Sequence, residues 1–530
     1  MSKLVLLGDE AIAQGALDAG LSGVYAYPGT PSTEITEYIQ RSEPVRQGQV
    51  RADWTANEKT ALEAALGMSY AGKRTMACMK HVGLNVAADP FMNAAVTGIN
   101  GGVLVVAADD PSMHSSQNEQ DSRFYGKFAG IPVLEPSSQQ EAYELTRYGF
   151  DLSEKFRLPV MIRIPTRLAH SRSAVERSPV RIQNSMAMPS DPGQFVLLPA
   201  LARKKYRLLL SVREKLEEEA ATSGVNRLEQ GKEKKRGVIA CGLAYNYYRE
   251  VAEKYRLDEP VLKISQYPVA PEMIKDFVGM VEEVVVLEEG YPLVEESLRG
   301  ILDTGYVIRG RMDGILPRDG ELNPAIVAGA LDLRREKPAT VSDVVKSRPP
   351  ALCKGCGHAD MFLALNEALA EYGPGRVFSD IGCYTLGALP PFNAINSCVD
   401  MGASVTMAKG ASDAGLHPSV AVIGDSTFTH SGMTGLLDAV VDGSPVTVII
   451  SDNSATGMTG GQKSHATGRL EQICGGLGVE KQHIRVMIPL RKNHAANVKV
   501  LKEELAYEGV SVIISDRECI QTAKKKVRKG

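Results

Sequence analysis

Short apolar runs, rich in β-branched residues, alternate with alanine-rich or amphipathic stretches along most of the chain. In residues 1–178, four such runs predict buried strands: Val24–Tyr27, Thr75–Met79, Gly102–Ala107 and Pro159–Ile164. The stretches between them have the spacing of helices, as in Asn57–Ala71 and Gln139–Phe156. Strands that alternate with helices in this way predict an α/β fold built on parallel sheets.

Changes in composition divide the rest of the chain. Residues 179–236 predict a linker: Pro, Met and Ser give way to Arg203–Lys235, which is dense in Lys, Arg and Glu. Its simplest interpretation is a solvated connector. Within it, Leu209, Val212 and Leu216 recur at helical spacing, so part of the linker is expected to be a helix lying across a surface. Residues 237–335 predict a smaller α/β domain, with a strand at Gly237–Cys241, a helix to Tyr255 and strands at Val261–Ile264 and Val284–Leu287. Residues 336–530 form the last predicted domain, which follows a turn-rich joint at Arg348–Pro350.

Composition excludes several classes of protein. The 530 residues carry 60 Lys and Arg against 63 Asp and Glu, so the chain lacks the excess positive charge of a typical nucleic-acid-binding protein. Eight cysteines are too few for a disulfide scaffold. The apolar runs are far shorter than the roughly 20 residues that span a bilayer. Because Leu4–Leu7 is followed at once by Gly8-Asp9-Glu10, no secretory signal is predicted, and a cytoplasmic location is expected.

Two strand ends in the last domain predict a metal site. The run Val420–Ile423 leads into Gly424-Asp425-Ser426, and Val446–Ile450 leads into Asp452-Asn453. Asn453 lies 28 residues after Asp425. A right-handed crossover would place Asp425 and Asn453 at the same edge of neighbouring parallel strands. With the carbonyl of Ala455, they offer the oxygen ligands that Mg²⁺ prefers beside a phosphate. The alternative is a plain structural turn, since these residue types are common in turns.

This segment resembles the thiamine-diphosphate motif, with Ser426 in place of its second glycine. The surrounding sequence resembles that of the 2-oxoacid:ferredoxin oxidoreductases, and most of all that of the α subunits of the indolepyruvate type. The likeness covers nearly the whole chain; the stretches that carry it are Ala26–Ser32, Met79–Asn85, Asp380–Gly387 and Thr456–Gln462.

The resemblance implies a pyrimidine-binding thiamine domain (1–178), a transketolase-C-like domain (237–335) and a diphosphate-binding thiamine domain (336–530). It implies oxidative decarboxylation of a 2-oxoacid, most simply an arylpyruvate, with coenzyme A as cosubstrate and ferredoxin as electron acceptor. It also implies a smaller β subunit, in an α2β2 assembly. The alternatives are a non-oxidative thiamine-dependent decarboxylase, which needs no cluster, and a catalytically silent scaffold subunit.

The resemblance also assigns roles to residues. Glu58 matches the carboxylate that contacts the aminopyrimidine ring; the sequence alone offers too many glutamates to choose from, among them Glu58 and Glu63 on the same predicted helix. The alternative for Glu58 is an exposed carboxylate at the start of that helix. Thr30 matches a hydroxyl that contacts substrate or thiazolium; its alternative is a cap for a helix at Ser32–Gln40. His81 and His114 are further candidates for the same cleft. The expected cofactor-binding residues are Gly424, Asp425, Ser426, Asn453, Ala455 and His358.

Four of the eight cysteines predict a redox site. By itself, Cys353-x2-Cys356 is compatible with zinc, a redox pair or no function. Together with Cys383 and Cys519 it matches the family's [4Fe–4S] site, in which thiolates hold the cluster. No cysteine follows Cys519, so the cysteine-rich ferredoxin domain of many such α subunits is expected to be absent. The remaining four are expected to be small buried apolar residues: Cys78, Cys241, Cys398 and Cys474.

Overall fold

The computed structural model describes residues 3–189, 191, 193–301, 306–333, 341–346 and 349–529. The chain divides into two compact units, residues 1–339 and residues 340–530, and each is described by itself.

The first unit is built on a seven-stranded sheet. Its strands are parallel except for β12 at one edge. Their order is β12 (Gln266–Tyr267), β6 (Val133–Leu134), β7 (Val160–Pro165), β5 (Val103–Asp109), β4 (Thr75–Lys80), β2 (Gly23–Ala26) and β3 (Arg51–Trp54). The four strands predicted for residues 1–178 are confirmed to within about two residues at each end.

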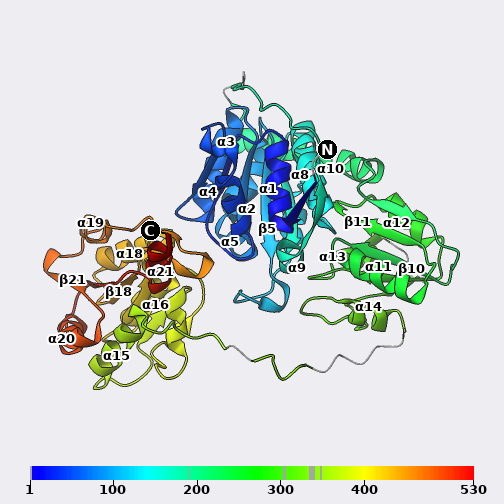
Figure 1. The fold of residues 1–530 in the computed structure, drawn as a ribbon. Coiled ribbons are helices and arrows are strands. Elements are labelled where there is room, and N and C mark those ends of the chain that lie inside the picture. The colour runs from blue at the N-terminus through cyan, green and yellow to red at the C-terminus, as the bar shows by residue number, and fades with distance from the viewer. Residues whose placement is uncertain are drawn as a thin grey trace. The chain divides into compact units, whose positions relative to one another are not determined.

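Helices cover both faces of this sheet, which explains why its central strands β4, β5 and β7 are buried along their whole length. Alternate residues of β4 point to opposite sides, so that Met76 and Cys78 belong to one core and Ala77 and Met79 to the other. The first core is closed by α1 (Gly8–Asp18), α2 (Thr33–Gln40) and α8 (Gln139–Phe156), which pack together in Figure 1. The second is closed by α4 (Glu58–Tyr70) and α6 (Ala88–Thr97).

Shorter elements complete this part of the unit. They are α3 (Glu43–Arg46), α5 (His81–Val86), α7 (Arg123–Ala129), α9 (Thr166–His170) and the antiparallel pair of β1 (Lys3–Leu7) and β8 (Arg172–Glu176).

The helix expected in the charged linker is α10 (Pro199–Thr222). Leu209 and Leu216 are buried in the second core, and Val212 packs against it. The apolar stripe of α10 therefore lies on α6 and the sheet edge, and its charged residues face away from that core.

A second sheet of five strands follows, and its helices lie on the right of the unit in Figure 1. Its order is β14 (Val307–Arg309), β13 (Glu283–Leu287), β10 (Arg236–Cys241), β11 (Val261–Ile264) and β9 (Arg227–Glu229), with only β9 antiparallel. Its helices are α11 (Ala244–Tyr255), α12 (Pro271–Val278), α13 (Leu293–Ile301) and α14 (Pro324–Ala330). Strand β12, which follows β11, joins the seven-stranded sheet instead, and this pairing ties the two sheets into one unit.

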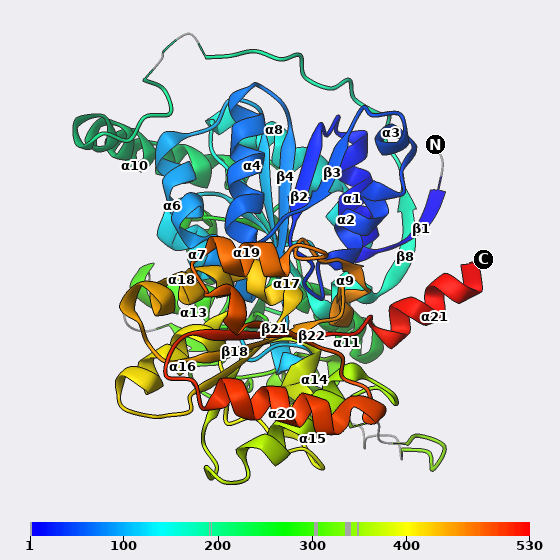
Figure 2. The ribbon, with the colours of Figure 1, turned by 90° about the vertical axis from the view of Figure 1, so that its left-hand side faces the viewer.

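The second unit holds a six-stranded, fully parallel sheet. Its order is β16 (Ser397–Cys398), β15 (Val377–Ser379), β17 (Val420–Gly424), β18 (Thr447–Asp452), β22 (Ser511–Asp516) and β21 (Ile484–Met487). On one face, α15 (Gly357–Leu369) and α20 (His494–Leu505) lie side by side, as Figure 2 shows. The other face is covered by α16 (Ala403–Asp413), α18 (Met433–Asp442) and α19 (Leu470–Gly476).

The remaining elements of this unit are α17 (Asp425–Thr427), α21 (Ile520–Lys529) and the antiparallel pair of β19 (Ala455–Thr456) and β20 (Gln462–Lys463). The predicted α/β class with parallel sheets is confirmed. Among the described residues, no helix combines the length and the apolar character needed to cross a bilayer.

Candidate active site

Asp425 and Asn453 lie at the same edge of the six-stranded sheet. Strands β17 and β18 are parallel neighbours, with Gly424 opposite Ser451. Asp425 begins the helical turn directly after β17, and Asn453 follows the last residue of β18. The edge position predicted from the crossover rule is therefore what the fold contains.

The Asp425 carboxylate is buried, with 2% of the residue exposed, and its Oδ2 atom has no hydrogen-bond partner. Burial raises the pKa of Asp425 to about 7, and the nearby Asp452 carboxylate adds to the shift. A buried carboxylate oxygen without a partner costs free energy unless a cation or a donor meets it. The residue thus offers a free oxygen ligand at the sheet edge.

Asn453 is held in a defined orientation. Its Oδ1 accepts from the backbone N–H of Ala455 at 3.0 Å, so its Nδ2 faces His358 Nε2 at 3.4 Å. His358 is buried, and burial lowers its pKa to about 4, so the ring is neutral near pH 7. Because Asn453 Nδ2 donates to Nε2, the ring proton is on Nδ1, which donates to Ser451 Oγ at 2.6 Å.

The residues beside Asp425 are tightly packed. A Cβ atom on Gly424 would lie 2.6 Å from the ring of Tyr384, so no larger residue fits there without a shift. Ser426 lies 3.0 Å from Thr456, measured between their hydroxyl oxygens. The serine that replaces glycine in the motif is thus bonded to the segment that follows Asn453.

The four cysteines come together at the same end of this unit. Each of the other three thiols acts electrostatically on Cys383, whose pKa rises to about 12, first through burial and then through Cys356, Cys519 and Cys353. A Cβ atom on Gly457 would lie 3.1 Å from Cys383 Sγ and 4.0 Å from Cys519 Sγ. The backbone N–H of Cys519 donates to the carbonyl of Asn453 at 3.1 Å, which joins the cysteine cluster to the strand end described above.

The other cysteines differ among themselves. Cys78, Cys241 and Cys474 are buried, as predicted, whereas Cys398 is exposed. The prediction for Cys398 is wrong because the residue lies on the two-residue edge strand β16, where only one side has a neighbouring strand. Its thiol donates to the carbonyl of Asp380.

In the first unit, Glu58 and Glu63 have opposite surroundings. Glu58 opens α4 and is 5% exposed, whereas Glu63 is exposed and pairs with Lys59. Gly83 of α5 lies directly over Glu58, because a Cβ atom there would be 2.5 Å from Glu58 Oε1. The interpretation of Glu58 as an exposed helix-start carboxylate is therefore wrong, and of the two glutamates it is the one enclosed by protein.

The turn that holds Thr30 adjoins Lys80, which is not among the site residues predicted from the sequence. Thr30 does not cap α2, because Ser32 occupies the N-cap position. The carbonyl of Thr30 accepts from Ser115 Oγ at 3.4 Å, and Lys80 Nζ donates to the carbonyl of Ser115 at 2.6 Å. Burial lowers the pKa of Lys80 to about 8. Lys80 ends a fully buried strand, and only the fold reveals that its ammonium group lies near Thr30.

His81 and His114 are placed differently from each other. His81 is fully buried, and its Nε2 lies 3.2 Å from the carbonyl oxygen of Asn118. His114 is exposed and lies 3.3 Å from Glu321. Of these two candidates, only His81 has the burial expected of a residue in an enclosed cleft.

Comparisons with known proteins place these features in a family. The chain is 42% identical to indolepyruvate oxidoreductase subunit IorA of Archaeoglobus fulgidus, over 98% of this chain and 86% of the relative. It is 38% identical to the IorA subunit of Thermococcus kodakarensis, over the same shares of both chains. This chain belongs to the IorA family.

Family models agree with this IorA membership. The pyruvate flavodoxin/ferredoxin oxidoreductase thiamine diphosphate-binding model matches residues 14–222. The C-terminal thiamine pyrophosphate-binding model of thiamine pyrophosphate enzymes matches residues 380–513. The predicted enzyme class, a thiamine diphosphate-dependent 2-oxoacid:ferredoxin oxidoreductase, is confirmed by these matches, as are the two thiamine-type domains of the predicted fold.

A solved structure shares the fold. It is the 2-oxoglutarate:ferredoxin oxidoreductase of Magnetococcus marinus, with 2-oxoglutarate, coenzyme A and succinyl-CoA bound. The TM-score is 0.52 at 18% identity, and the match covers 62% of this chain and 65% of that one. This IorA-family chain therefore spans less than two thirds of the solved chain it matches.

Proposed function

We propose that this chain, with a smaller β subunit in an α2β2 assembly, oxidatively decarboxylates an arylpyruvate such as indolepyruvate. The 2-oxoacid and coenzyme A give acyl-CoA, CO₂ and a proton, and two electrons pass one at a time through an internal [4Fe–4S] cluster to ferredoxin. The observation that carries the proposal is the hydrogen bond from Cys519 to Asn453, because it joins a cysteine cluster to the strand end expected to hold the cofactor. A non-oxidative decarboxylase would have no use for that junction. We also propose a cytoplasmic location.

The diphosphate end of the cofactor would be held at the edge of the six-stranded sheet. Asp425, Asn453 and the carbonyl of Ala455 would bind Mg²⁺, beside Gly424 and Ser426. The unpaired Oδ2 of Asp425 fits this role, since a buried carboxylate oxygen is a ligand that Mg²⁺ prefers. His358 would keep Asn453 in place through its ring nitrogen, as a positioning residue. When bound, thiamine diphosphate supplies a nucleophilic carbon and takes up the negative charge released by decarboxylation.

Glu58 would act on the other end of the cofactor, from this chain or from a second copy of it. A carboxylate against the aminopyrimidine ring holds the proton that activates the cofactor. The enclosure of Glu58 beneath Gly83 supports this role, because a buried carboxylate keeps a fixed position. We accordingly propose residues 1–178 as the pyrimidine-binding domain, 179–236 as a linker, 237–335 as a transketolase-C-like domain and 336–530 as the diphosphate-binding domain.

The cysteines favour a cluster over zinc. Four thiolates around one zinc ion at about 2.3 Å would have sulfur atoms about 3.8 Å apart. Among the described residues, one set of three ligating side chains has all its ligand atoms within 4.8 Å of one another, and it lies in the first unit. No three of the four cysteine sulfur atoms, which all belong to described residues, are therefore as close together as a single zinc ion requires. An iron–sulfur cluster binds its cysteines at separate iron atoms and thus suits a wider arrangement of thiolates.

Thr30 and Lys80 would meet the substrate. The Lys80 ammonium group is buried and lies in the same hydrogen-bonded group as the Thr30 turn. A buried cation is suited to the carboxylate that every 2-oxoacid carries, because low dielectric strengthens the attraction. The Thr30 hydroxyl would contact the keto group or the thiazolium ring.

The test is an anaerobic assay of the complete chain with its partner subunit. We expect reduction of ferredoxin that requires an arylpyruvate, coenzyme A and thiamine diphosphate together, with acyl-CoA as product. Release of an aldehyde without reduction of ferredoxin would instead identify the non-oxidative decarboxylase. Turnover that persists when both Asp425 and Glu58 are replaced would support a scaffold role for this chain.

A further inference from the structure

A buried carboxylate at the start of the first helix has no partner in the protein. Asp9 lies in the first turn of α1 and is completely buried, and neither of its carboxylate oxygens has a hydrogen-bond partner. Burial raises the pKa of Asp9 well above its ordinary value, and the charges of Glu34 and Glu10 add to the shift. Such a group is costly in the folded state unless something neutralises it.

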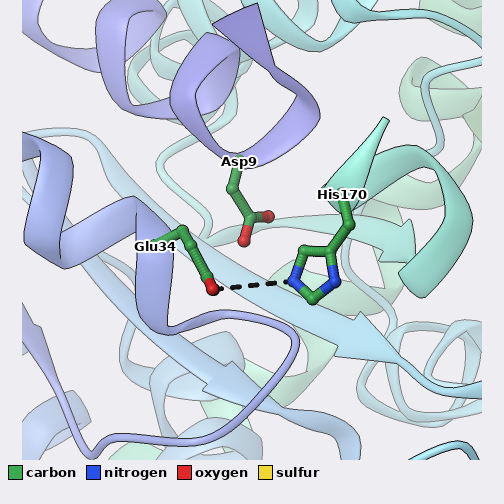
Figure 3. Close-up of side chains that lie close together, drawn as sticks. All are labelled: Asp9, Glu34 and His170. Atoms are coloured by element: carbon green, nitrogen blue, oxygen red, sulfur yellow. Dashed lines mark ion pairs between the residues drawn. The ribbon is translucent and has the colours of Figure 1, made fainter. Parts of the chain in front are cut away.

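Two further ligating side chains face Asp9. Glu34 comes from the first turn of α2, and His170 is the last residue of α9. Figure 3 shows the three side chains converging from three helices. Their ligand atoms all lie within 4.8 Å of one another, and Glu34 Oε2 is 3.6 Å from His170 Nε2.

We infer that Asp9, Glu34 and His170 bind a divalent transition-metal cation. Ligand atoms about 2.1 Å from an ion are about 3.0 to 4.2 Å apart, and the 3.6 Å separation of Glu34 and His170 lies in that range. Two carboxylates balance a charge of +2, and an imidazole nitrogen favours Mn²⁺, Fe²⁺ or Zn²⁺ over Ca²⁺ or Mg²⁺. This cation is distinct from the Mg²⁺ proposed at Asp425.

The exposure of the ligands fits an ion that enters from solvent. Asp9 is enclosed, Glu34 is half-buried and His170 is exposed, so one side of the group is open to water. Water molecules would complete the coordination there. Because α2 follows the Thr30 turn directly, the cation would fix that turn to α1 and α9.

Binding of Mn²⁺ tests the site. The complete chain, with its cluster and without thiamine diphosphate, is titrated with Mn²⁺ while free Mn²⁺ is followed by EPR. We expect one bound Mn²⁺ per chain, and coupling to one imidazole nitrogen in pulsed EPR. Asp9→Asn and His170→Gln should each weaken binding at least tenfold, and His170→Gln should also remove the nitrogen coupling.

Two control variants separate this site from others. Glu37→Gln removes a half-buried carboxylate on α2 that pairs with Arg41, and it should leave Mn²⁺ binding unchanged. Asp425→Asn should also leave it unchanged, so a failure here is distinct from a failure of the proposed cofactor site.

Unchanged Mn²⁺ stoichiometry and affinity in His170→Gln would overturn the proposal. Unchanged binding in Asp9→Asn would also overturn it, and would identify the Asp9 side chain as a buried, protonated carboxyl. If Asp9→Asn does not fold, the variant of the exposed His170 decides the matter.

Discussion

His358 Nδ1 lies 2.6 Å from Ser451 Oγ, so the start of α15 is fixed to the end of β18. His358 follows Cys356 by two residues, and Ser451 precedes Asn453 by two. The bond therefore couples the turn of the first two cysteines to the proposed Mg²⁺ ligand. A change in the position of the cysteine turn is therefore expected to shift Asn453, and a shift of Asn453 is expected to move the turn.

Asp425→Asn should weaken the Mg²⁺-dependent binding of thiamine diphosphate by about 100-fold or more, since it removes a charged, buried ligand. Isothermal titration with and without Mg²⁺ measures the effect. Asp442→Asn, which alters an exposed carboxylate on α18 of the same unit, is the control and should bind like the wild type. Equal affinity in Asp425→Asn would show that Asp425 does not hold the ion.

Glu58→Gln should retain the cofactor but slow the exchange of its C2 proton by about 10²–10⁴, the usual effect of a positioned acid–base group. Exchange into deuterated water, followed by NMR after quenching, gives the rate. Glu63→Gln lies on the same helix, is exposed, and should exchange normally. If the two variants exchanged at the same rate, Glu58 would lose its assigned role.

Anaerobically purified protein should contain about four irons per chain, the content of one [4Fe–4S] cluster. Cys519→Ser should lower that content, although Cys519 is far from Cys353 and Cys356 in the sequence. Cys398→Ser is the matched control, because that thiol is exposed and bonds to Asp380 rather than to the other cysteines. Zinc in place of iron, or normal iron in Cys519→Ser, would refute the four-cysteine site.

The proposed role of Lys80 predicts a pH dependence. Because the pKa of Lys80 is about 8, its ammonium group loses its proton as the pH rises through 8, and the affinity for an unreactive 2-oxoacid analogue should fall above that pH. The fall should approach about tenfold per pH unit. Lys80→Met should bind the analogue weakly at every pH, whereas Lys59→Met, an exposed control, should follow the wild type. A flat profile for the wild type would contradict the role.

Glu289 predicts a pH effect on stability. It is fully buried, its Oε1 accepts from the N–H of Leu322, and its Oε2 has no partner. Burial raises its pKa to about 7, so between its ordinary value of 4.5 and 7 the folded state keeps a proton that the unfolded state releases. This group therefore lowers the stability as the pH rises through that window, by up to about 3 kcal/mol.

Glu289→Gln cannot ionise and should lack this pH-dependent loss. The unfolding temperature of the variant minus that of the wild type should be larger at pH 8 than at pH 5. Calorimetry at the two pH values measures both differences. Equal differences would mean that Glu289 titrates near its ordinary value.

Much of the fold could be predicted because local pattern and topology agree. The central strands of the first sheet bury apolar residues on both faces, so their positions follow from the sequence. The shared edge of Asp425 and Asn453 follows from the handedness of the crossover. Strand β12 could not be predicted, because two residues carry no periodicity and their partner strand lies more than 130 residues earlier.

The site was less accessible to sequence reasoning. The choice between Glu58 and Glu63 depends on burial under Gly83, which is a tertiary contact. Lys80 and Asp9 are distinguished by the burial of their side chains, which depends on the tertiary fold. The exposure of Cys398 could not be predicted, because the sequence does not show that its short strand lies at the edge of a sheet.

The pairing of β12 with β6 also sets an order of events during synthesis. Residues 133–134 meet residues 266–267, so the edge of the first sheet stays open until the second half of the unit has left the ribosome. Closing so long a loop is slow compared with local helix formation. A nascent chain that stalls within the linker would therefore expose an unpaired strand edge, to which other chains can pair.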